Sequence, residues 1–537
     1  MRKSGHKNIA RQNGGKQAVS HTAMVWSALI LYVSITLFLT IRGMLRTKDL
    51  ASFAVGNRDI GPAWVGLSLT AQLTSVATFV VNPGLVYTYG LSALLGLGFA
   101  AGMGIIAGLC ILSGPFRSVG DKVKALTIPQ WIGARYESKW LRIFFALISL
   151  SLISFIVLIA VAIALTLFSL LQLTDINQTT WLVVGIMVFV FSYTLLGGAN
   201  TSTYTNAIQA LVMLVVALIL IGSGYEHFAG EGLLAKITAT NPELTSLTNP
   251  GSLYFRNFFE VFICNFIVGL AIVCQPHILG KSLLLKDESQ IKTYLAVAII
   301  AGTAFVSVMF VGLYARVALT EVVRGDLIVP TYIAKSFSSG TQVLISMGLL
   351  CAGISTLEGL LLALSAIFSS DIYLTLRPIN PETREQDLKK ALLFGRVALI
   401  LVGIGCIFLS IWQLRNPTGG SVAIFAQYGV YLLFTATFLP IACGLFLPSV
   451  GRELISKGVI ASTLFYFLPA LIHRFAPDAP FFNMANNPAI LATCGIVAGW
   501  LVVAAGLALQ KKPAMAVGGA AVEQLVPVSV NQAEKTE

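Results

Sequence analysis

The 537-residue chain is 56% hydrophobic and only 11% charged, and its mean hydropathy is +0.84. Soluble domains carry about a quarter charged residues, so this composition excludes a soluble globular protein and predicts an integral membrane protein. The net charge of +12 does not indicate a nucleic-acid partner, because the Lys and Arg residues lie between apolar runs and form no continuous basic face. We expect the lipid bilayer to surround the chain, and we infer no obligate protein partner.

Apolar runs long enough to cross a hydrocarbon core of about 30 Å as helices recur along the chain. A polar tail over 1–23 precedes them, and a Pro-, Gly- and Ala-rich tail over 511–537 is predicted to be disordered. The residues between, 24–510, are predicted to form one all-α polytopic transmembrane domain. About thirteen spans are expected, at 24–41, 62–82, 92–113, 143–172, 180–196, 205–224, 258–279, 294–317, 342–370, 393–413, 422–446, 458–474 and 488–510.

An odd number of spans places the two termini on opposite sides of the membrane. The expected loops on one side hold about two-thirds of all Lys and Arg residues. The positive-inside rule therefore favours a cytoplasmic C-terminus and an outside N-terminus, although the basic residues of the N-terminal tail oppose this orientation. We expect a multi-pass protein of the cell membrane, either a plasma membrane or a bacterial inner membrane.

The second expected span carries an unusual number of polar groups, within "GLSLTAQLTSVATFVVNPGLVY" at 66–87. An unpaired polar group in lipid costs several kcal/mol, so these side chains must face protein, water or a ligand. Asn82, Pro83 and Gly84 then predict an interruption of the helix, which is typical of discontinuous helices that bind ions near the middle of the membrane. The polar side chains are Ser68, Thr70, Gln72, Thr74, Ser75 and Thr78.

A second polar cluster lies in the apolar stretch "GLLCAGISTLEGLLLALSAIFSSDIY" at 348–373. Ser355 and Thr356 are adjacent hydroxyls, Ala352 precedes them by one turn, and Glu358 is an ionisable group inside a span, which makes it a functional candidate. Structural explanations stay open: hydroxyls bond back to their own helix, small residues permit close helix packing, and a neighbouring helix satisfies a glutamate.

Several motifs together resemble the sodium:solute symporter family. They are "AQLTS" at 71–75 with the "NPGLVY" that follows, "LLGGANTSTYTNAIQALVM" at 195–213, "QPHILGKSLL" at 275–284 and "AGISTLEGLLLALSAIFSSDIY" at 352–373. Each motif is weak alone, but their order and spacing are similar to those of that family, and the first is similar to its monocarboxylate, iodide and multivitamin branch.

The resemblance implies a leucine-transporter-type core of two inverted five-helix repeats, at about 60–224 and 258–446. It also implies a sodium site between the first helix of the first repeat and the third helix of the second. Na⁺ is thereby the expected coupling ion. The implied ligands are backbone carbonyls of Ala71, Thr74 and Ala352 and hydroxyls of Ser355 and Thr356.

The chain departs from the family pattern at positions that affect the ion route and the solute. Asn206 stands where several relatives carry an acid, so it joins Glu358 as a candidate for ion coupling. Leu73 replaces a polar residue of the proline and sugar transporters, which disfavours both solutes. We find no intramembrane Arg or Lys near the spans at 62–82, 258–279, 342–370 and 422–446 that would bind a carboxylate directly, so helix-end amides are expected to hold an anion. Residues expected near the solute are Gln72, Leu73, Thr78, Gln427, Tyr428 and Tyr431.

The sequence thus predicts a secondary transporter and not an enzyme. It contains no GxxxxGK[ST] phosphate-binding loop, so an ion gradient is the expected source of energy. The favoured function is sodium-coupled symport of a small organic solute, such as a monocarboxylate, by alternating access. Two alternatives stay open: proton coupling through Glu358 in the same fold, and a sensor that binds solute without transporting it.

Overall fold

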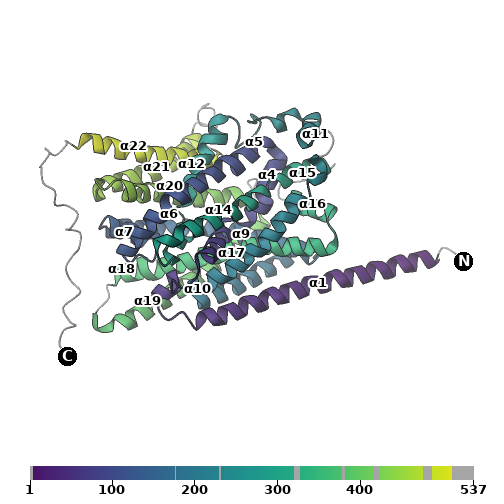
Figure 1. Ribbon diagram of the computed structural model, residues 1–537, viewed down its shortest axis with the longest axis horizontal. Coiled ribbons are helices and arrows are strands. Elements are labelled where there is room, and N and C mark those ends of the chain that lie inside the picture. The colour runs from purple at the N-terminus through teal and green to yellow at the C-terminus, as the bar shows by residue number, and fades with distance from the viewer. Residues whose placement is uncertain are drawn as a thin grey trace.

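A computed structural model describes residues 4–175, 177–228, 232–319, 327–377, 381–416, 422–475 and 486–510. The expected tail over 511–537 lies outside these residues. The described chain is a bundle of helices without a β-strand, and most of them run roughly parallel or antiparallel to one another (Figure 1). The first residues of α1 and the last residues of α22 lie at opposite ends of the bundle.

The helix bounds show where the expected spans begin and end. In the first half they are α1 (Ser4–Met44), α2 (Leu50–Val55), α3 (Pro62–Leu73), η1 (Ala77–Val81), α4 (Asn82–Tyr89), α6 (Ala101–Lys122), α7 (Ile128–Arg135), α8 (Lys139–Ile148), α9 (Ile153–Leu170), α10 (Gln178–Gly222) and α11 (Leu233–Thr240). In the second half they are η6 (Phe259–Cys264), α12 (Asn265–Ile272), α13 (Pro276–Leu279), η7 (Gly280–Leu284), α14 (Ile291–Ser307), α15 (Phe310–Ala318), α16 (Ile328–Ser336), α17 (Ser339–Ile367), η10 (Phe368–Tyr373), α18 (Leu374–Leu376), α19 (Arg384–Arg415), α20 (Val422–Phe446), α21 (Arg452–Phe475) and α22 (Pro488–Leu509).

Within the described residues, ten helices are long and apolar enough to cross a membrane, or up to twelve when each of two bent pairs counts as one span. The expected count of thirteen is not confirmed. The difference arises in α10, which is counted once but consists of two helices that meet at a kink of non-helical backbone at Gly198, over the two spans expected at 180–196 and 205–224. Gly198 has a φ of 64°, a conformation that strongly favours glycine, and Phe53 of α2 packs against it.

The first bent pair is the discontinuous helix that the polar cluster predicts, but its break lies elsewhere. Pro62–Leu73 and Ala77–Tyr89 meet at 59°, so the chain leaves the helix at 74–76 and not at Asn82–Gly84. Pro83 follows the wider helical turn η1, and the backbone at Val81 and Asn82 is helical. The helix therefore continues past the proline.

A second bent pair opens the second half of the chain. Phe259–Ile272 and Pro276–Leu284 meet at 56°, with Gln275 in extended conformation at the break. Each of the two expected repeats thus begins with a broken helix. Between them lies α17, which is almost entirely buried and packs against α3, α9 and α10.

Glycines bring α6 and α12 into backbone contact. A Cβ atom on Gly104 would lie 2.2 Å from the carbonyl oxygen of Phe266, and one on Gly269 would lie 2.1 Å from that of Ala101. Gly108 faces the carbonyl oxygen of Leu270 in the same way, at 2.7 Å. These three positions exclude any side chain, so the two helices pack with no side-chain layer between them.

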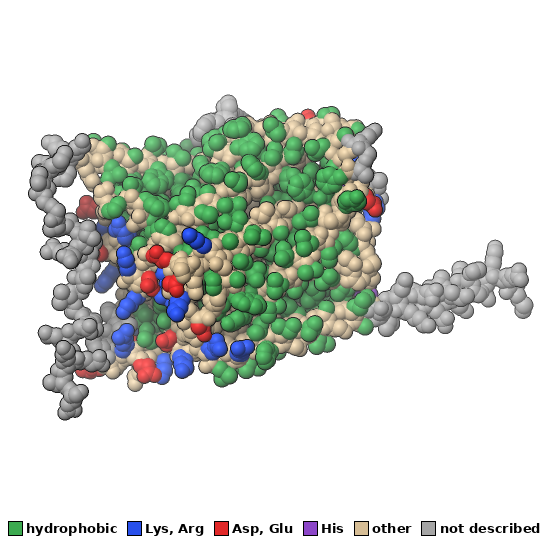
Figure 2. All heavy atoms as spheres, viewed as in Figure 1, with side chains coloured by type: hydrophobic (Ala, Val, Ile, Leu, Met, Phe, Trp, Pro, Cys, Tyr) green, Lys and Arg blue, Asp and Glu red, His purple; other side chains and the backbone are tan. Residues whose placement is uncertain are grey.

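Charged side chains gather at one end of the molecule. On the face in Figure 2, Lys, Arg, Asp and Glu cluster toward the left, and hydrophobic side chains cover most of the rest. Figure 1 places α7 and α18 at this end. An ion pair of 2.6 Å between Arg58 and Asp121 ties the segment before α3 to the end of α6. We refer to this region as the charged end.

Candidate ion and solute site

The break in α3 leaves backbone carbonyls without helical partners, and two hydroxyls of α17 meet them. Ser355 Oγ donates to the carbonyl oxygen of Ala71 at 2.8 Å, and Thr356 Oγ1 lies 3.2 Å from that of Gln72. Both hydroxyls also lie 3.1 Å from the carbonyl oxygen of Ala352. The two polar clusters of the sequence, nearly 300 residues apart, therefore converge at one point, and bonding back to their own helix is only part of the role of the hydroxyls.

The oxygens at this point have the chemistry of a site for a monovalent cation. Ala71, Ala352, Ser355 and Thr356 are all fully buried, and Thr74 is 4% exposed. Thr74 ends α3 in extended conformation, where the helical pattern of carbonyl bonding stops. All these ligands are neutral carbonyl and hydroxyl oxygens, which suit a hard ion such as Na⁺ and let it leave again.

Glu358 lies one turn beyond these hydroxyls and is held by donors from α10. Its carboxylate accepts from Thr205 Oγ1 at 3.0 Å and from Tyr193 Oη at 3.2 Å, and the residue is 1% exposed. Donors on the neighbouring helix α10 thus satisfy the hydrogen-bonding needs of the Glu358 carboxylate, which is the structural explanation that the sequence analysis leaves open. The Glu358 carboxyl group is therefore a buried ionisable group on the same helix as the candidate ion site.

Amide side chains extend this buried polar region. Asn206 Nδ2 and Gln72 Nε2 both donate to Ser202 Oγ, at 3.1 and 3.3 Å. The oxygens Gln72 Oε1 and Asn206 Oδ1 are buried without a hydrogen-bond partner. Ser202 therefore links Gln72, which the sequence analysis expects near the solute, to Asn206, which it expects on the ion route.

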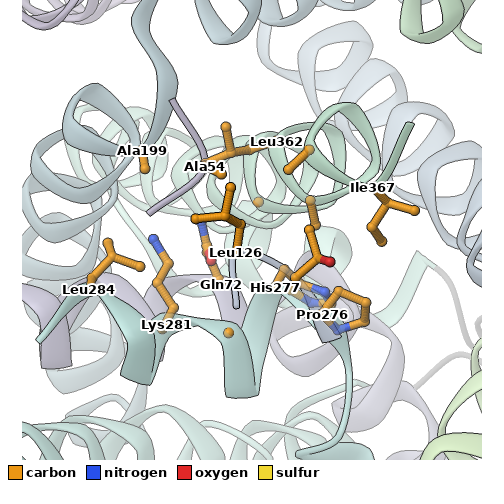
Figure 3. A pocket seen from close by; sticks show the side chains of 15 residues that line it. Ala54, Gln72, Leu126, Ala199, Pro276, His277, Lys281, Leu284, Leu362 and Ile367 are labelled. Atoms are coloured by element: carbon orange, nitrogen blue, oxygen red, sulfur yellow. The ribbon is translucent and has the colours of Figure 1, made fainter. Parts of the chain in front are cut away.

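A cavity of about 50 Å³ opens beside Gln72 and is lined by a lysine. Figure 3 shows Lys281, His277 and Gln72 around it, from η7, α13 and α3. Lys281 is 5% exposed, its Nζ donates to Ser68 Oγ at 2.9 Å, and its charge interacts with that of Glu358. Lys281 is therefore a buried basic residue close to the expected span at 258–279, where the sequence analysis finds none. The sequence feature that could have indicated this residue is its place in the chain. Lys281 lies five residues after Pro276 and just after the expected end of the span at 258–279.

The remaining solute candidates lie on α20 and around the first break. Tyr428 and Tyr431 are half-buried on α20, where Tyr466 donates to the carbonyl of Tyr428 at 2.7 Å and Tyr431 packs on Phe434. Gln427 on the same helix is also half-buried. Near the first break, Leu73 and Thr78 are half-buried as well. Whether these residues contact the solute stays a prediction.

Comparisons with known proteins match this architecture. The sodium:solute symporter family model matches residues 53–453. The chain is 25% identical over 375 residues to the sodium/pantothenate symporter of Haemophilus influenzae, covering 67% of this chain and 73% of that protein. It is 24% identical over 406 residues to a high-affinity proline transporter of Bacillus subtilis, covering 74% and 81%. It is also 21% identical over 529 residues to a monocarboxylic acid transporter of Corynebacterium glutamicum, covering 92% and 93%.

A solved structure shares the fold. A substrate-bound, outward-open Na⁺-coupled sialic acid symporter superposes with a TM-score of 0.72 at 18% identity, covering 90% of this chain and 98% of that one. The inverted repeats that the sequence analysis expects, each opened here by a broken helix, are consistent with this neighbour. Because the family model covers most of the chain, the protein belongs to the sodium:solute symporter family, and it is a sodium-coupled membrane transporter of small solutes and not an enzyme.

Proposed function

We propose that this protein carries out sodium-coupled symport of a small organic acid by alternating access. The observation that carries the proposal is the convergence of Ser355 and Thr356 on the carbonyls of Ala71 and Gln72 at the break in α3. An ion at this point contacts both expected repeats at once. Its binding therefore favours particular arrangements of α3 against α17, which is the requirement for coupling ion and solute.

The proposed sodium ligands are the five residues that the family resemblance implies. Ala71, Thr74 and Ala352 contribute carbonyl oxygens, and Ser355 and Thr356 contribute hydroxyls. Their burial excludes water from the ion, and their neutrality keeps the ion from binding too tightly to leave. Glu358 and Asn206, close to these ligands, are the proposed positions for tuning ion release.

The solute class follows from chemistry that the named relatives share. Pantothenate, proline and monocarboxylic acids, the solutes in the names of three relatives, all carry a carboxyl group. The chain lacks a polar residue at Leu73, where proline and sugar transporters have one, which favours an acid with a small apolar body. We therefore propose a monocarboxylate.

The distribution of charge supports a cytoplasmic location for the charged end. It contains the end of α1, the start of α19 and the helix α7, whose flanking loops hold many of the Lys and Arg residues. The positive-inside rule places such loops in the cytoplasm. This orientation puts the N-terminus outside and the C-terminus inside.

The energetics of symport depend on the number of sodium ions. A membrane potential of 100 mV supplies about 2.3 kcal/mol per charge, and a tenfold sodium gradient supplies about 1.4 kcal/mol. A monocarboxylate that moves with one Na⁺ carries no net charge, so only the chemical gradient acts on it. With two Na⁺ ions the potential contributes as well.

Uptake into proteoliposomes tests the proposal. Purified protein is reconstituted and given labelled acetate, pyruvate, lactate or pantothenate under an inward gradient of Na⁺, of K⁺ or of protons. We expect one of these acids to accumulate with Na⁺ and not with K⁺. Accumulation driven by protons alone would support the proton-coupled alternative. Binding of an acid without any accumulation would support a sensor.

A further inference from the structure

We infer that the cavity beside Lys281 is an inner binding site for the carboxylate of the solute, on its route to the charged end. This inference rests on the proposed function, because it assumes that the solute is an acid. It assigns a role to Lys281, His277 and the side-chain amide of Gln72, three groups that the proposed sodium site does not use.

The polar groups that line this cavity are nearly completely buried and keep unused hydrogen-bonding capacity. Lys281 Nζ has three N–H groups, and among the described residues the structure gives it one hydrogen bond, to Ser68. His277 is 5% exposed, and its Nδ1 has no partner. A buried ammonium with unused donors is costly unless an anion or another acceptor completes its coordination. A carboxylate supplies two oxygen acceptors in this place.

Lys281 has no acidic partner close to its ammonium group. Glu358 uses its oxygens to accept from Thr205 and Tyr193, and no ion pair within 4.0 Å joins it to Lys281 in the described part of the chain. A solute carboxylate in the cavity would therefore give Lys281 an acceptor of opposite charge.

The walls of the cavity match the rest of such a solute. Ala54, Leu126, Leu284, Leu362 and Ile367 supply apolar surface around the polar groups. The cavity measures about 50 Å³, which is room for a few water molecules or for the carboxylate group of a small acid. The ligand class is therefore a monocarboxylate with a short apolar chain.

The position of the cavity places it on the inner side of the transporter. Ala54 belongs to α2, and Leu126 and Thr127 immediately precede α7, which lies at the charged end (Figures 1 and 3). Gln72 also lines the cavity, and its backbone carbonyl oxygen accepts from Thr356 Oγ1 of α17 at 3.2 Å. The cavity thus runs from the candidate sodium site toward the proposed cytoplasmic side.

Equilibrium exchange measured from each face of the membrane tests this role. Right-side-out and inverted vesicles contain the same Na⁺ concentration as the medium. The concentration of labelled acid is varied in the medium only. The acid is lactate or whichever acid the wild type transports. For Lys281→Met we expect the half-saturation concentration to rise at least tenfold in inverted vesicles and less than threefold in right-side-out vesicles. Lys281→Arg, which keeps the charge, is expected to stay within threefold of the wild type on both faces.

Controls separate the inference from the proposed function. Lys286→Met removes an exposed lysine of the same segment and is expected to change neither value. Equal shifts on both faces, or no shift, in Lys281→Met would overturn the inner site while leaving symport intact. No sodium-dependent exchange of any acid by the wild type would instead overturn the proposed function. If Lys281→Met does not fold, as judged by thermal unfolding, Lys281→Gln replaces it, because its amide still reaches Ser68.

Discussion

Each of the two broken helices bends sharply at a short non-helical segment, but the groups around the two breaks suit ions of opposite charge. At the first break, between α3 and η1, the freed carbonyls of Ala71 and Gln72 face the hydroxyls of α17. Oxygen atoms dominate this point, and none of the five proposed ligands is charged. The first break is therefore suited to a cation.

At the second break the freed carbonyls are already satisfied. Gln275 Nε2 donates to the carbonyl of Ile272 at 3.2 Å, and Thr437 Oγ1 lies 3.3 Å from that of Cys274. The residues that follow, His277 and Lys281, turn nitrogen groups to the cavity. The comparison shows that a helix break supplies only a place inside the membrane, and the side chains around it decide which charge binds there.

The largest effect is expected from removing the hydroxyls at the first break. In Ser355→Ala/Thr356→Ala we expect the sodium concentration for half-maximal uptake to rise more than a hundredfold. Thermal unfolding provides a second measurement, because sodium at 100 times its Kd stabilises the folded wild type by about 2.7 kcal/mol. The double variant is expected to lose this protection.

Ser369→Ala is the matched control for that experiment. Ser369 is a buried serine farther along the same span, and its hydroxyl donates to the carbonyl of Ser365 within the helix at 2.8 Å. It is expected to retain the sodium response. Unchanged sodium protection in the double variant would show that the first break does not bind the ion.

A test of packing at the second break compares two glycines. Gly269→Ala places a methyl group 2.1 Å from the carbonyl of Ala101, whereas Gly302→Ala meets only Thr70 Cγ2 at 3.7 Å. We expect Gly269→Ala to lower the free energy of unfolding by about 3 kcal/mol and Gly302→Ala to change it by less than about 0.5 kcal/mol. Similar melting temperatures for the two variants would contradict close α6–α12 packing.

Glu358 connects the two breaks electrostatically, so its replacement tests how independent they are. Glu358→Gln substitutes an amide for the acceptor of Thr205 and Tyr193, which we expect to cost about 2 kcal/mol of stability. Adding Lys281→Met removes the opposite charge and is expected to recover about 1 kcal/mol. Additive losses in thermal unfolding of the single and double variants would show that the two charges do not interact.

The smallest effect is expected at the charged end, far from both breaks. Asp49 caps α2, and hydrogen bonds from the backbone N–H and hydroxyl of Ser52 lower its pKa from the ordinary 3.8. Asp49→Ala is expected to cost at most about 1 kcal/mol. Because the folded pKa is the lower one, the stabilisation is complete above pH 3.8 and disappears as the pH falls through the folded value. The difference in melting temperature between variant and wild type should therefore be smaller at pH 3 than at pH 6.

The sequence predicted much of the first break because hydroxyls and amides stand out in an apolar segment. It misplaced the break, because Asn82, Pro83 and Gly84 are strong local signals, whereas the residues at 74–76 carry no helix breaker. Contacts from α17, which no local pattern reveals, satisfy the carbonyls there. Local propensity thus predicted that the helix is broken, and tertiary contacts decided where.

The second break was harder to predict. Lys281 lies near the end of an apolar run, where lysines commonly reach the membrane surface, so the sequence gives no sign that it is buried. Its burial depends on Ser68 of α3, more than 200 residues away. The grouping of Gln72 with Tyr428 and Tyr431 around the solute stays a prediction, because sequence alone does not show which neighbours surround each side of a broken helix.

The glycine contacts between α6 and α12 have a mechanical consequence. Side-chain layers let helices slide, because rotamers adjust as one helix passes another, but these two helices meet through backbone atoms at three points. Any shift along their common axis would bring a carbonyl oxygen into a Cα atom, so the pair resists shear. Motion that starts at the second break is therefore transmitted to α6 without loss, and relative sliding is left to surfaces where side chains lie between the helices.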